Sequence, residues 1–289
     1  MKELNLTSID NSEIKYKINN YPDGQRDINI LPTFWITANF TITAITIKSR
    51  LNNMEDLNLI ICATQALRNL GLKEIHLYVP YIMGLRSDRL FAKGGVRYIK
   101  DILAPIINSQ NYESVTCIDA HSFVAENCIN NLQVLDNVHL VKFALSDLNI
   151  KKKFVLVSPD DGASKKIYKV AEAIDYKGEI IICSKSRNAD GTLFKTNVPL
   201  NDRESKSFII VDDICDGGNT FINIARIIRR AYDGLEDISN IKIYLIVTHG
   251  IFSQGTTELG QYFDHIYTTN SYQDCNALDR LKVNQLKVF

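Results

Sequence analysis

The hydrophobic pattern of the chain alternates between short apolar runs and longer stretches with helical spacing. The runs are rich in β-branched residues, as expected of buried strands, and cover residues 42–47, 74–80, 114–119, 154–158, 179–184, 207–211, 241–247 and 264–268. Helices are expected between a cap at Asn52 or Asn53 and Gly71, and near residues 95–108, 163–174 and 220–232. Strands that alternate with helices indicate an α/β protein whose parallel sheets are covered on both faces.

The same plan of strands and helices occurs in both halves of the chain, which predicts two α/β domains in tandem. No linker rich in Pro, Gly or Ser separates the halves. The apolar pattern is interrupted near residues 140–150, so we expect the domains to cover residues 1–143 and 144–289.

Composition and charge exclude several classes of protein. The 289 residues include 33 Lys and Arg and 33 Asp and Glu, which gives zero formal net charge, and 45% are hydrophobic. This hydrophobic fraction is too high for a disordered chain, and zero net charge gives no general attraction to nucleic acid or to an anionic membrane. The uncharged run Phe34–Ile47 is too short to span a bilayer and is typical of β structure. The six cysteines form no CxxC pair and the first residues contain no apolar signal segment, so we expect a cytoplasmic protein with reduced thiols.

The most informative segment is Phe208–Thr220, in which an apolar strand leads into an acidic, glycine-rich loop and then a helix. Glycines let backbone N–H groups come close to a phosphate, and the start of a helix favours an anion. Carboxylates beside such a loop suit ribose hydroxyls or a metal ion, because carboxylate oxygens accept hydrogen bonds and coordinate cations. The segment therefore predicts a sugar-phosphate site built from Asp212, Asp213, Asp216, Gly217, Gly218, Asn219 and Thr220.

This segment resembles the binding motif for phosphoribosyl pyrophosphate (PRPP) that type I phosphoribosyltransferases share with ribose-phosphate diphosphokinases, the PRPP synthetases. Further segments resemble elements of the diphosphokinases alone, in the order of that family. They are YPDGQ (21–25), VPYIMGLRSDRLF (79–91), CIDAH (117–121), VSPDDGASK (157–165), THGIFSQG (248–255) and TTNS (268–271). The ordered set favours the diphosphokinase family, of which this chain resembles a short and divergent member.

The resemblance implies a fold and a reaction. The fold would be two tandem doubly wound domains of the type I phosphoribosyltransferase kind, each with a mainly parallel sheet. The reaction would transfer the diphosphoryl group of ATP to the anomeric hydroxyl of ribose 5-phosphate, giving PRPP and AMP. It would use Mg²⁺, which keeps water and phosphate oxygens among its ligands. The family also implies a homo-oligomer, a dimer or a hexamer, with no nucleic acid or membrane as partner.

The same resemblance assigns roles to individual residues. His121 and Asp160 match the metal-binding positions of the family, and Asp119 could orient the imidazole of His121. Lys185 and Arg187 match its catalytic cations, which would neutralise charge on the transferring group. The polar stretch 188–206 is expected to be a flexible loop that closes over the site.

The ATP-binding role falls on two further stretches. Asp23, Gly24 and Gln25 match the family segment that reaches adenine from a neighbouring subunit. Arg86, Ser87 and Arg89 match its ATP-binding element, and His121 would contact the nucleotide through the metal.

The chain departs from the family pattern at several positions. The departures are the short segment before residue 21, Gln25 in place of Glu, Ser87 in place of Gln, Ala120 in place of Leu, Ser186 in place of Arg and Asn219 in place of Gly.

Two other functions remain open. A phosphoribosyltransferase that consumes PRPP would explain residues 208–220 but not residues 79–121, Lys185 or Arg187. A non-catalytic regulatory relative would be expected to have lost the metal-binding and catalytic residues.

Overall fold

A computed structural model describes residues 1–31, 43–150, 153–187, 193–200, 207–232, 241–275 and 283–289, with side chains except at 185–187 and 193–195. The chain forms two compact units, Met1–Leu135 with Phe289, and Asp136–Val288. The sequence places the boundary at 143/144, inside helix α5 (Val138–Leu148). The Tyr267 hydroxyl donates a hydrogen bond to Asp147 of α5 (2.8 Å), which ties the whole helix to the second unit.

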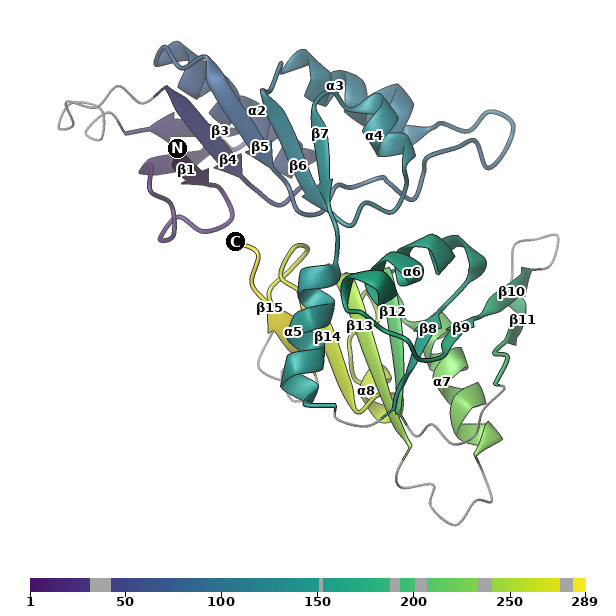
Figure 1. The fold of residues 1–289 in the computed structure, drawn as a ribbon. Coiled ribbons are helices and arrows are strands. Elements are labelled where there is room, and N and C mark those ends of the chain that lie inside the picture. Colours follow the sequence, from purple (N-terminus) through teal and green to yellow (C-terminus); the bar gives the residue numbers. More distant parts are fainter. Residues whose placement is uncertain (32–42, 151–152, 188–192, 201–206, 233–240, 276–282) are drawn as a thin grey trace. The chain divides into compact units, whose positions relative to one another are not determined.

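The first unit is built on a five-stranded parallel sheet with the order β1-β4-β5-β6-β7 (Figure 1). A separate antiparallel hairpin, β2–β3, precedes β4. The strands are β1 (Lys2–Asn5), β2 (Tyr16–Asn20), β3 (Arg26–Ile30), β4 (Ala44–Lys48), β5 (Glu74–Tyr78), β6 (Ser114–Ile118) and β7 (Leu132–Leu135). The helices are α2 (Met54–Asn69), a π-helical turn (Ile99–Leu103) that continues into α3 (Ala104–Ser109), and α4 (Val124–Cys128).

The connections of this sheet explain why only one of its faces is fully apolar. From β4 to β7 each strand adds on the same side of the previous one, and right-handed crossovers then bring α2, α3 and α4 to one face. The residues Ile45, Ile75 and Val115 on that face are buried. The residues between them in each strand are only half-buried, among them Thr46 and His76. In the described part of this sheet, one face is therefore more deeply buried than the other.

The second unit contains a six-stranded parallel sheet with the order β15-β14-β13-β12-β8-β9. The strands are β8 (Val155–Ser158), β9 (Ile180–Ile182), β12 (Ser207–Cys215), β13 (Lys242–Gly250), β14 (His265–Thr269) and β15 (Val283–Leu286). The helices, besides α5, are a 3₁₀ turn (Asp161–Ala163), α6 (Ser164–Ala173), α7 (Asn219–Ala231) and α8 (Leu259–Tyr262).

Apolar residues cover both faces of this second sheet. Ile209 and Val211 of β12 pack on the α5–α6 side, with buried residues such as Leu140 and Ile167. Phe208 and Ile210, which alternate with them, pack on the α7 side. The expectation of a doubly covered parallel sheet holds here because the order of the strands reverses at β8, so crossovers reach both faces.

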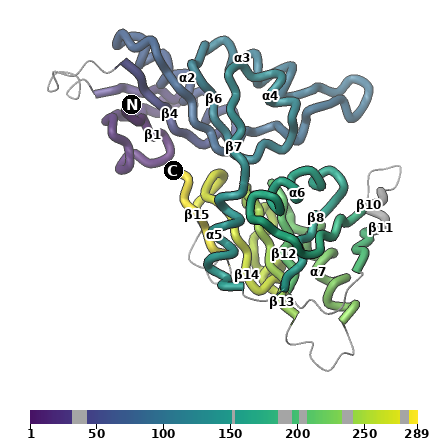
Figure 2. The backbone as a smooth tube through the Cα atoms, in the orientation of Figure 1, coloured from purple at the N-terminus to yellow at the C-terminus, as the bar shows by residue number. Residues whose placement is uncertain are grey.

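Most of the expected elements occur with boundaries shifted by a few residues, and several others were not expected. The polar stretch 188–206 is not all loop, because β11 (Leu193–Asn197) pairs antiparallel with β10 (Ser184–Arg187). Figure 2 follows the chain from β9 into this hairpin. The expected β structure at 34–42 lies outside the described residues. Within the part that the structure describes, no helix is long and apolar enough to cross a bilayer.

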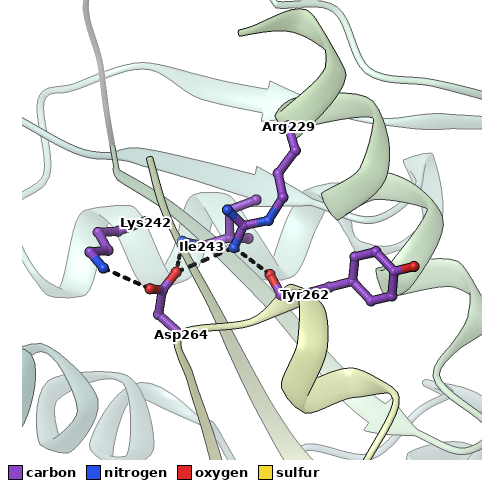
Figure 3. Close-up of polar contacts among 5 residues, drawn as sticks. All are labelled: Arg229, Lys242, Ile243, Tyr262 and Asp264. Carbon is purple, nitrogen blue, oxygen red and sulfur yellow. Dashed lines mark hydrogen bonds and ion pairs between the residues drawn. The ribbon is translucent and has the colours of Figure 1, made fainter. Parts of the chain in front are cut away.

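A charged cluster ties α7 and α8 to the amino-terminal end of β13. The Asp264 carboxylate accepts hydrogen bonds from Lys242 Nζ (2.9 Å) and from the backbone N–H of Ile243 (3.0 Å). Arg229 lies 3.5 Å from the same carboxylate and donates to the Tyr262 carbonyl at 2.8 Å (Figure 3). Burial alone would raise the pKa of Asp264, but these donors outweigh it and hold the pKa below its ordinary value.

We expect Asp264→Asn to lower the thermal midpoint of the second unit by roughly 4–8 °C at neutral pH, since hydrogen bonds to a charged group contribute about 1.5–3 kcal/mol. A lowered carboxyl pKa stabilises the fold above the unfolded-state pKa near 4, and this contribution disappears as the pH falls through the lower folded-state value. The difference between variant and parent should therefore shrink between pH 7 and pH 3 in differential scanning calorimetry.

Asp175→Asn is the matched control, because Asp175 and its partner Lys177 are both largely exposed, at 87% and 82%. It should leave the midpoint almost unchanged. An equal effect of the two substitutions would contradict the role of the Asp264 cluster.

Candidate functional site

The strand order of the second unit identifies one end of its sheet as the place for a ligand. The chain leaves β8 toward β9 on one side, whereas β12 lies on the other side of β8. In open parallel sheets, such a reversal opens a crevice outside the carboxyl ends of the two strands. Asp160 follows β8, and the predicted sugar-phosphate loop follows β12, so the fold brings these two predicted segments to the same crevice.

The loop after β12 has the backbone geometry expected of an anion site. Gly218 is the N-cap residue of α7 with φ +84°, a conformation that favours glycine. A Cβ atom at Gly218 would lie 3.0 Å from Leu259 Cδ2, so α8 closes the space as well. No side chain caps α7 at this residue, and the first N–H groups of the helix point toward the loop. Asn219 and Thr220 form the first turn of α7, as the sequence predicts.

The two adjacent carboxylates at the end of β12 have different environments. Asp213 is 5% exposed and accepts a hydrogen bond from Lys166 Nζ at 2.5 Å. Asp212 is partly exposed and accepts a hydrogen bond from the backbone N–H of Asp213 at 2.9 Å. The sequence predicts the same role for both carboxylates, but in the structure they differ in exposure and in hydrogen-bond partners.

The acidic residues of this crevice influence one another. Removal from water raises the pKa of the Asp212 carboxyl well above its ordinary value, and Asp213 and Asp160 raise it further, against the opposing effects of the Asp213 N–H and Lys166. Burial likewise raises the pKa of the Cys215 thiol, and Asp212 and Asp216 add to this. The crevice therefore favours a ligand that brings cations or hydroxyl donors to its carboxylates.

Asp160 starts the element that faces the sugar-phosphate loop. Its Oδ1 accepts a hydrogen bond from the backbone N–H of Ala163 at 3.1 Å and so caps the 3₁₀ turn before α6. The Ser158 hydroxyl donates to the Asp160 carbonyl at 2.9 Å. These contacts fix the conformation of the segment after β8.

A buried polar network supports the loop from the next two strands. The segment after β13 is attached to β12 by hydrogen bonds from the N–H groups of Ile251 and Phe252 to the Cys215 carbonyl, at 2.9 and 3.1 Å. His249 Nδ1 lies 2.7 Å from Ser271 Oγ, and the Thr269 hydroxyl donates to the Thr248 carbonyl at 2.7 Å. These residues lie in the segments THGIFSQG (248–255) and TTNS (268–271), which resemble elements of the diphosphokinases. Their hydrogen bonds join the end of β13 to the end of β14.

In the first unit, two predicted ATP-binding segments meet at the carboxyl ends of β5 and β6. Arg86, Ser87 and Arg89 follow β5, and His121 follows β6, its neighbour in the sheet. The Ser122 hydroxyl donates to Asp88 Oδ2 at 2.7 Å and joins the segments. Arg86, Arg89 and His121 are exposed. Arg89 also lies over the ring of Phe91, at 5.5 Å from its centroid.

The third predicted ATP-binding segment forms the turn of the β2–β3 hairpin. Asp23 Oδ1 accepts from the N–H of Gln25 at 3.1 Å, and the Tyr21 N–H donates to the Gln25 carbonyl at 2.8 Å. The hairpin packs on α2, where Asn58 donates to the Arg26 carbonyl. Asp23, Gly24 and Gln25 are exposed at the tip of the hairpin.

The predicted catalytic residues lie on a separate two-stranded ribbon. Lys185 and Arg187 are on β10, where Lys185 pairs with Thr196 of β11. Their side chains are outside the described part of the chain.

The predicted metal ligands His121 and Asp160 lie in different units. Among the described residues, no three His, Cys, Asp or Glu side chains gather to hold a metal ion. The carboxylate of Asp160 is an oxygen donor of the kind Mg²⁺ prefers, and a site that keeps water and phosphate oxygens needs only one or two protein ligands. The residues around Asp160 therefore fit a Mg²⁺ bound together with a phosphorylated ligand.

Sequence reasoning missed Lys166, which places a cation next to the acidic residue Asp213. One signal for its role was its position, because Lys166 directly follows the segment VSPDDGASK (157–165). A lysine in the first turn of a helix lies at the unfavourable end of the helix dipole and calls for a nearby anion.

Comparisons with known proteins agree with this geometry. The family described as phosphoribosyl transferase domain matches residues 131–250. The ribose-phosphate pyrophosphokinase of Mycoplasmopsis pulmonis is 28% identical over 82% of this chain and 72% of its own length. That of Thermosipho africanus is 26% identical over 93% of this chain and 82% of its own length. That of Pyrococcus furiosus is 25% identical over 91% of this chain and 86% of its own length.

A solved structure extends the likeness to the whole fold. The phosphoribosylpyrophosphate synthetase of Mycobacterium smegmatis matches 97% of this chain and 88% of its own chain, with a TM-score of 0.77 and 16% identity. This match shows that both units have the architecture of that protein. Taken with the curated relatives and the domain match, it supports the resemblance of the chain to the ribose-phosphate pyrophosphokinase family.

Proposed function

We propose that the protein transfers the diphosphoryl group of ATP to ribose 5-phosphate, forming PRPP and AMP. The observation that carries the proposal is the acidic, glycine-containing loop between β12 and α7, at the reversal of strand order in the second unit. The names of the relatives and the ordered sequence segments support the same reaction.

The second unit would bind the ribose 5-phosphate. The free N–H groups at the start of α7, with Gly217, Gly218, Asn219 and Thr220, suit the 5-phosphate. The carboxylates Asp212, Asp213 and Asp216 suit the ribose hydroxyls, which can donate hydrogen bonds to them. The first unit would bind ATP through Arg86, Ser87, Arg89 and His121, and the hairpin tip with Asp23, Gly24 and Gln25 would contact the base from a neighbouring copy in a homo-oligomer, a dimer or a hexamer.

The reaction requires positioning and charge neutralisation. The anomeric oxygen of ribose attacks the β-phosphorus of ATP, the bond from that phosphorus to the oxygen bridging it to the α-phosphate breaks, and AMP leaves. The hydroxyl proton is released to solvent. Lys185 and Arg187 would neutralise the charge that develops on the transferring phosphoryl oxygens.

We include Mg²⁺ in the proposal as the cation that neutralises the phosphates of ATP. Asp160 would hold it from the second unit, and His121 would serve as the second protein ligand. Its imidazole is a less usual ligand for Mg²⁺ than an oxygen, so the His121 assignment rests on the resemblance.

The proposal predicts that purified protein with Mg²⁺, ATP and ribose 5-phosphate forms AMP and PRPP, measured by anion-exchange chromatography. AMP that does not depend on ribose 5-phosphate, or no AMP at all, would refute it. A parallel incubation with PRPP and a panel of nucleobases should release no pyrophosphate; release would instead indicate a phosphoribosyltransferase.

Lys185→Ala should lower kcat by about 10²–10³, the loss expected when one charge-stabilising contact is removed. The melting temperature should be unchanged, as judged by circular dichroism. Lys195→Ala is the control, because Lys195 lies on the same hairpin, opposite Ser186. If both variants turn over at the same rate, Lys185 has no catalytic role.

Gly218→Ala should raise the KM for ribose 5-phosphate and destabilise the second unit by about 1–3 kcal/mol, because alanine is strained at φ +84° and its Cβ meets Leu259. Gly217→Ala is the control for stability, since a Cβ there would lie 3.5 Å from Gln254 Cγ, an ordinary contact. A Gly218→Ala protein that melts at the parent temperature would contradict the strained cradle.

A further inference from the structure

One hydrogen bond joins the two segments of the first unit that carry the proposed ATP-binding residues. The Ser122 hydroxyl donates to Asp88 Oδ2, with an oxygen–oxygen distance of 2.7 Å. In the sequence, Asp88 lies between Arg86 and Arg89, and Ser122 directly follows His121. Neither Ser122 nor Asp88 has a part in the proposed function so far, although each is a neighbour of residues that do.

The Ser122 hydroxyl is held in place by its own segment, at the end of β6. Ser122 is 9% exposed, and its Oγ accepts a hydrogen bond from the backbone N–H of Val124 at 3.2 Å. The Ser122 carbonyl accepts from the N–H of Ala125 at 3.2 Å, at the start of α4. Earlier in the segment, the Asp119 N–H donates to the carbonyl of Leu135, the last residue of β7, at 2.7 Å. The position of the donor hydroxyl is therefore fixed by contacts that do not involve the partner carboxylate.

The segment after β5 is irregular where it carries Asp88. The backbones after β5 and β6 are joined as far as the Ile118 N–H, which donates to the Pro80 carbonyl at 2.9 Å. A turn at residues 84–87 follows, and the chain beyond it is irregular. Because irregular chain lacks the repeated backbone hydrogen bonds of a strand or helix, a side-chain contact contributes more to fixing its position. The bond from the serine hydroxyl attaches this part of the chain to the end of β6.

The arginines of this segment differ from the aspartate in exposure. Arg86 and Arg89 are exposed, whereas Asp88 is half-buried and Leu85 is buried. A carboxylate turned outward between two arginines would attract their guanidinium groups and repel the phosphates of ATP. A hydrogen bond from a hydroxyl to a carboxylate is strengthened by the charge, which favours keeping Asp88 against Ser122. The guanidinium groups then remain at the surface, where an anion can reach them.

We propose that Ser122 and Asp88 are positioning residues for ATP. Their hydrogen bond sets the spacing between the arginine-bearing segment after β5 and His121 after β6, and it keeps the Asp88 carboxylate from competing with the phosphates. This inference rests on the proposed function, which assigns ATP to these two segments.

The first test compares the steady-state kinetics of the parent with those of Ser122→Ala. This substitution should raise the KM for ATP roughly tenfold, the lower end of the effect of losing a hydrogen bond to a charged group. The KM for ribose 5-phosphate and kcat should change much less, because neither Ser122 nor Asp88 is assigned to the reacting atoms.

Ser109→Ala is the matched control. The Ser109 hydroxyl also makes a 2.7 Å hydrogen bond, to the Ile106 carbonyl, but it lies at the end of α3, which leads to the amino-terminal end of β6. This variant should behave as the parent does. An equal KM for ATP in Ser122→Ala and Ser109→Ala would overturn the proposal, as would a rise of the same size in both substrates' KM values in Ser122→Ala.

The second test separates the hydrogen bond from the charge with Asp88→Asn and Asp88→Ala. Both substitutions remove the charge, but only the asparagine can still accept from Ser122. Asp88→Asn should keep the KM for ATP near that of the parent, and Asp88→Ala should raise it as Ser122→Ala does. Equal KM values in the two Asp88 variants would refute the hydrogen bond as the mechanism. If circular dichroism melting shows that Ser122→Ala does not fold, this pair of variants decides in its place.

The double variant Ser122→Ala/Asp88→Ala completes the comparison. If the two residues act through their shared bond, its KM for ATP should be no higher than that of either single variant. A KM in which the two single effects multiply would show that the residues act independently, against the proposal.

Isothermal titration calorimetry with ATP and Mg²⁺, without ribose 5-phosphate, separates this inference from the proposed reaction. If the parent binds ATP but forms no AMP when ribose 5-phosphate is added, the reaction is refuted, and the dissociation constants of the variants still test the positioning role. If the parent forms AMP and Ser122→Ala binds ATP as tightly as the parent does, only the positioning role is refuted. A parent that neither binds ATP nor reacts refutes both.

Discussion

Parallel strands must be connected by crossovers that run over a face of the sheet, and these crossovers are right-handed. In the first unit the strands from β4 to β7 follow one another in a single direction, which puts the intervening helices on one face. In the second unit the direction reverses between β8 and β12, so helices cover both faces and a crevice opens at the reversal. The location of the proposed ribose-phosphate site follows from this order of strands, before any side chain is considered.

Several charged residues of the second unit are grouped at that location. The chain has zero net charge, but Asp160, Asp212, Asp213 and Asp216 converge on the crevice between β8 and β12. Lys166 lies near these acidic side chains and forms an ion pair with Asp213. A crevice of this kind presents oxygen acceptors at one end and backbone N–H donors at the start of α7, which is the polarity of a phosphorylated sugar.

The sequence predicts elements well where one residue determines local geometry. Asn53 caps α2 through hydrogen bonds from the N–H groups of Glu55 and Asp56, and Gly71 ends the helix with φ +91°. The acidic strand-to-helix unit around Asp212 and Gly218 was also predictable, because its residue types and its backbone requirements coincide. By contrast, α5 was not expected: its buried stripe of Leu140, Val141 and Ala144 is short and partly small, and only packing on the second sheet reveals it.

Two features of the site depend on tertiary structure and cannot be found along the sequence. Adjacent aspartates in a strand look equivalent in a sequence, but in the structure Asp213 is buried and hydrogen-bonded to Lys166 of α6, whereas Asp212 is partly exposed. The cation that distinguishes them is forty-seven positions away in the chain, a separation that no local pattern bridges. Because a buried carboxylate needs partners, this contact links the residue at position 166 to the acidic motif at residues 212–216. A PRPP-type motif is therefore incompletely described by its own residues, because at least one of its carboxylates is hydrogen-bonded to a side chain on a helix from another part of the fold.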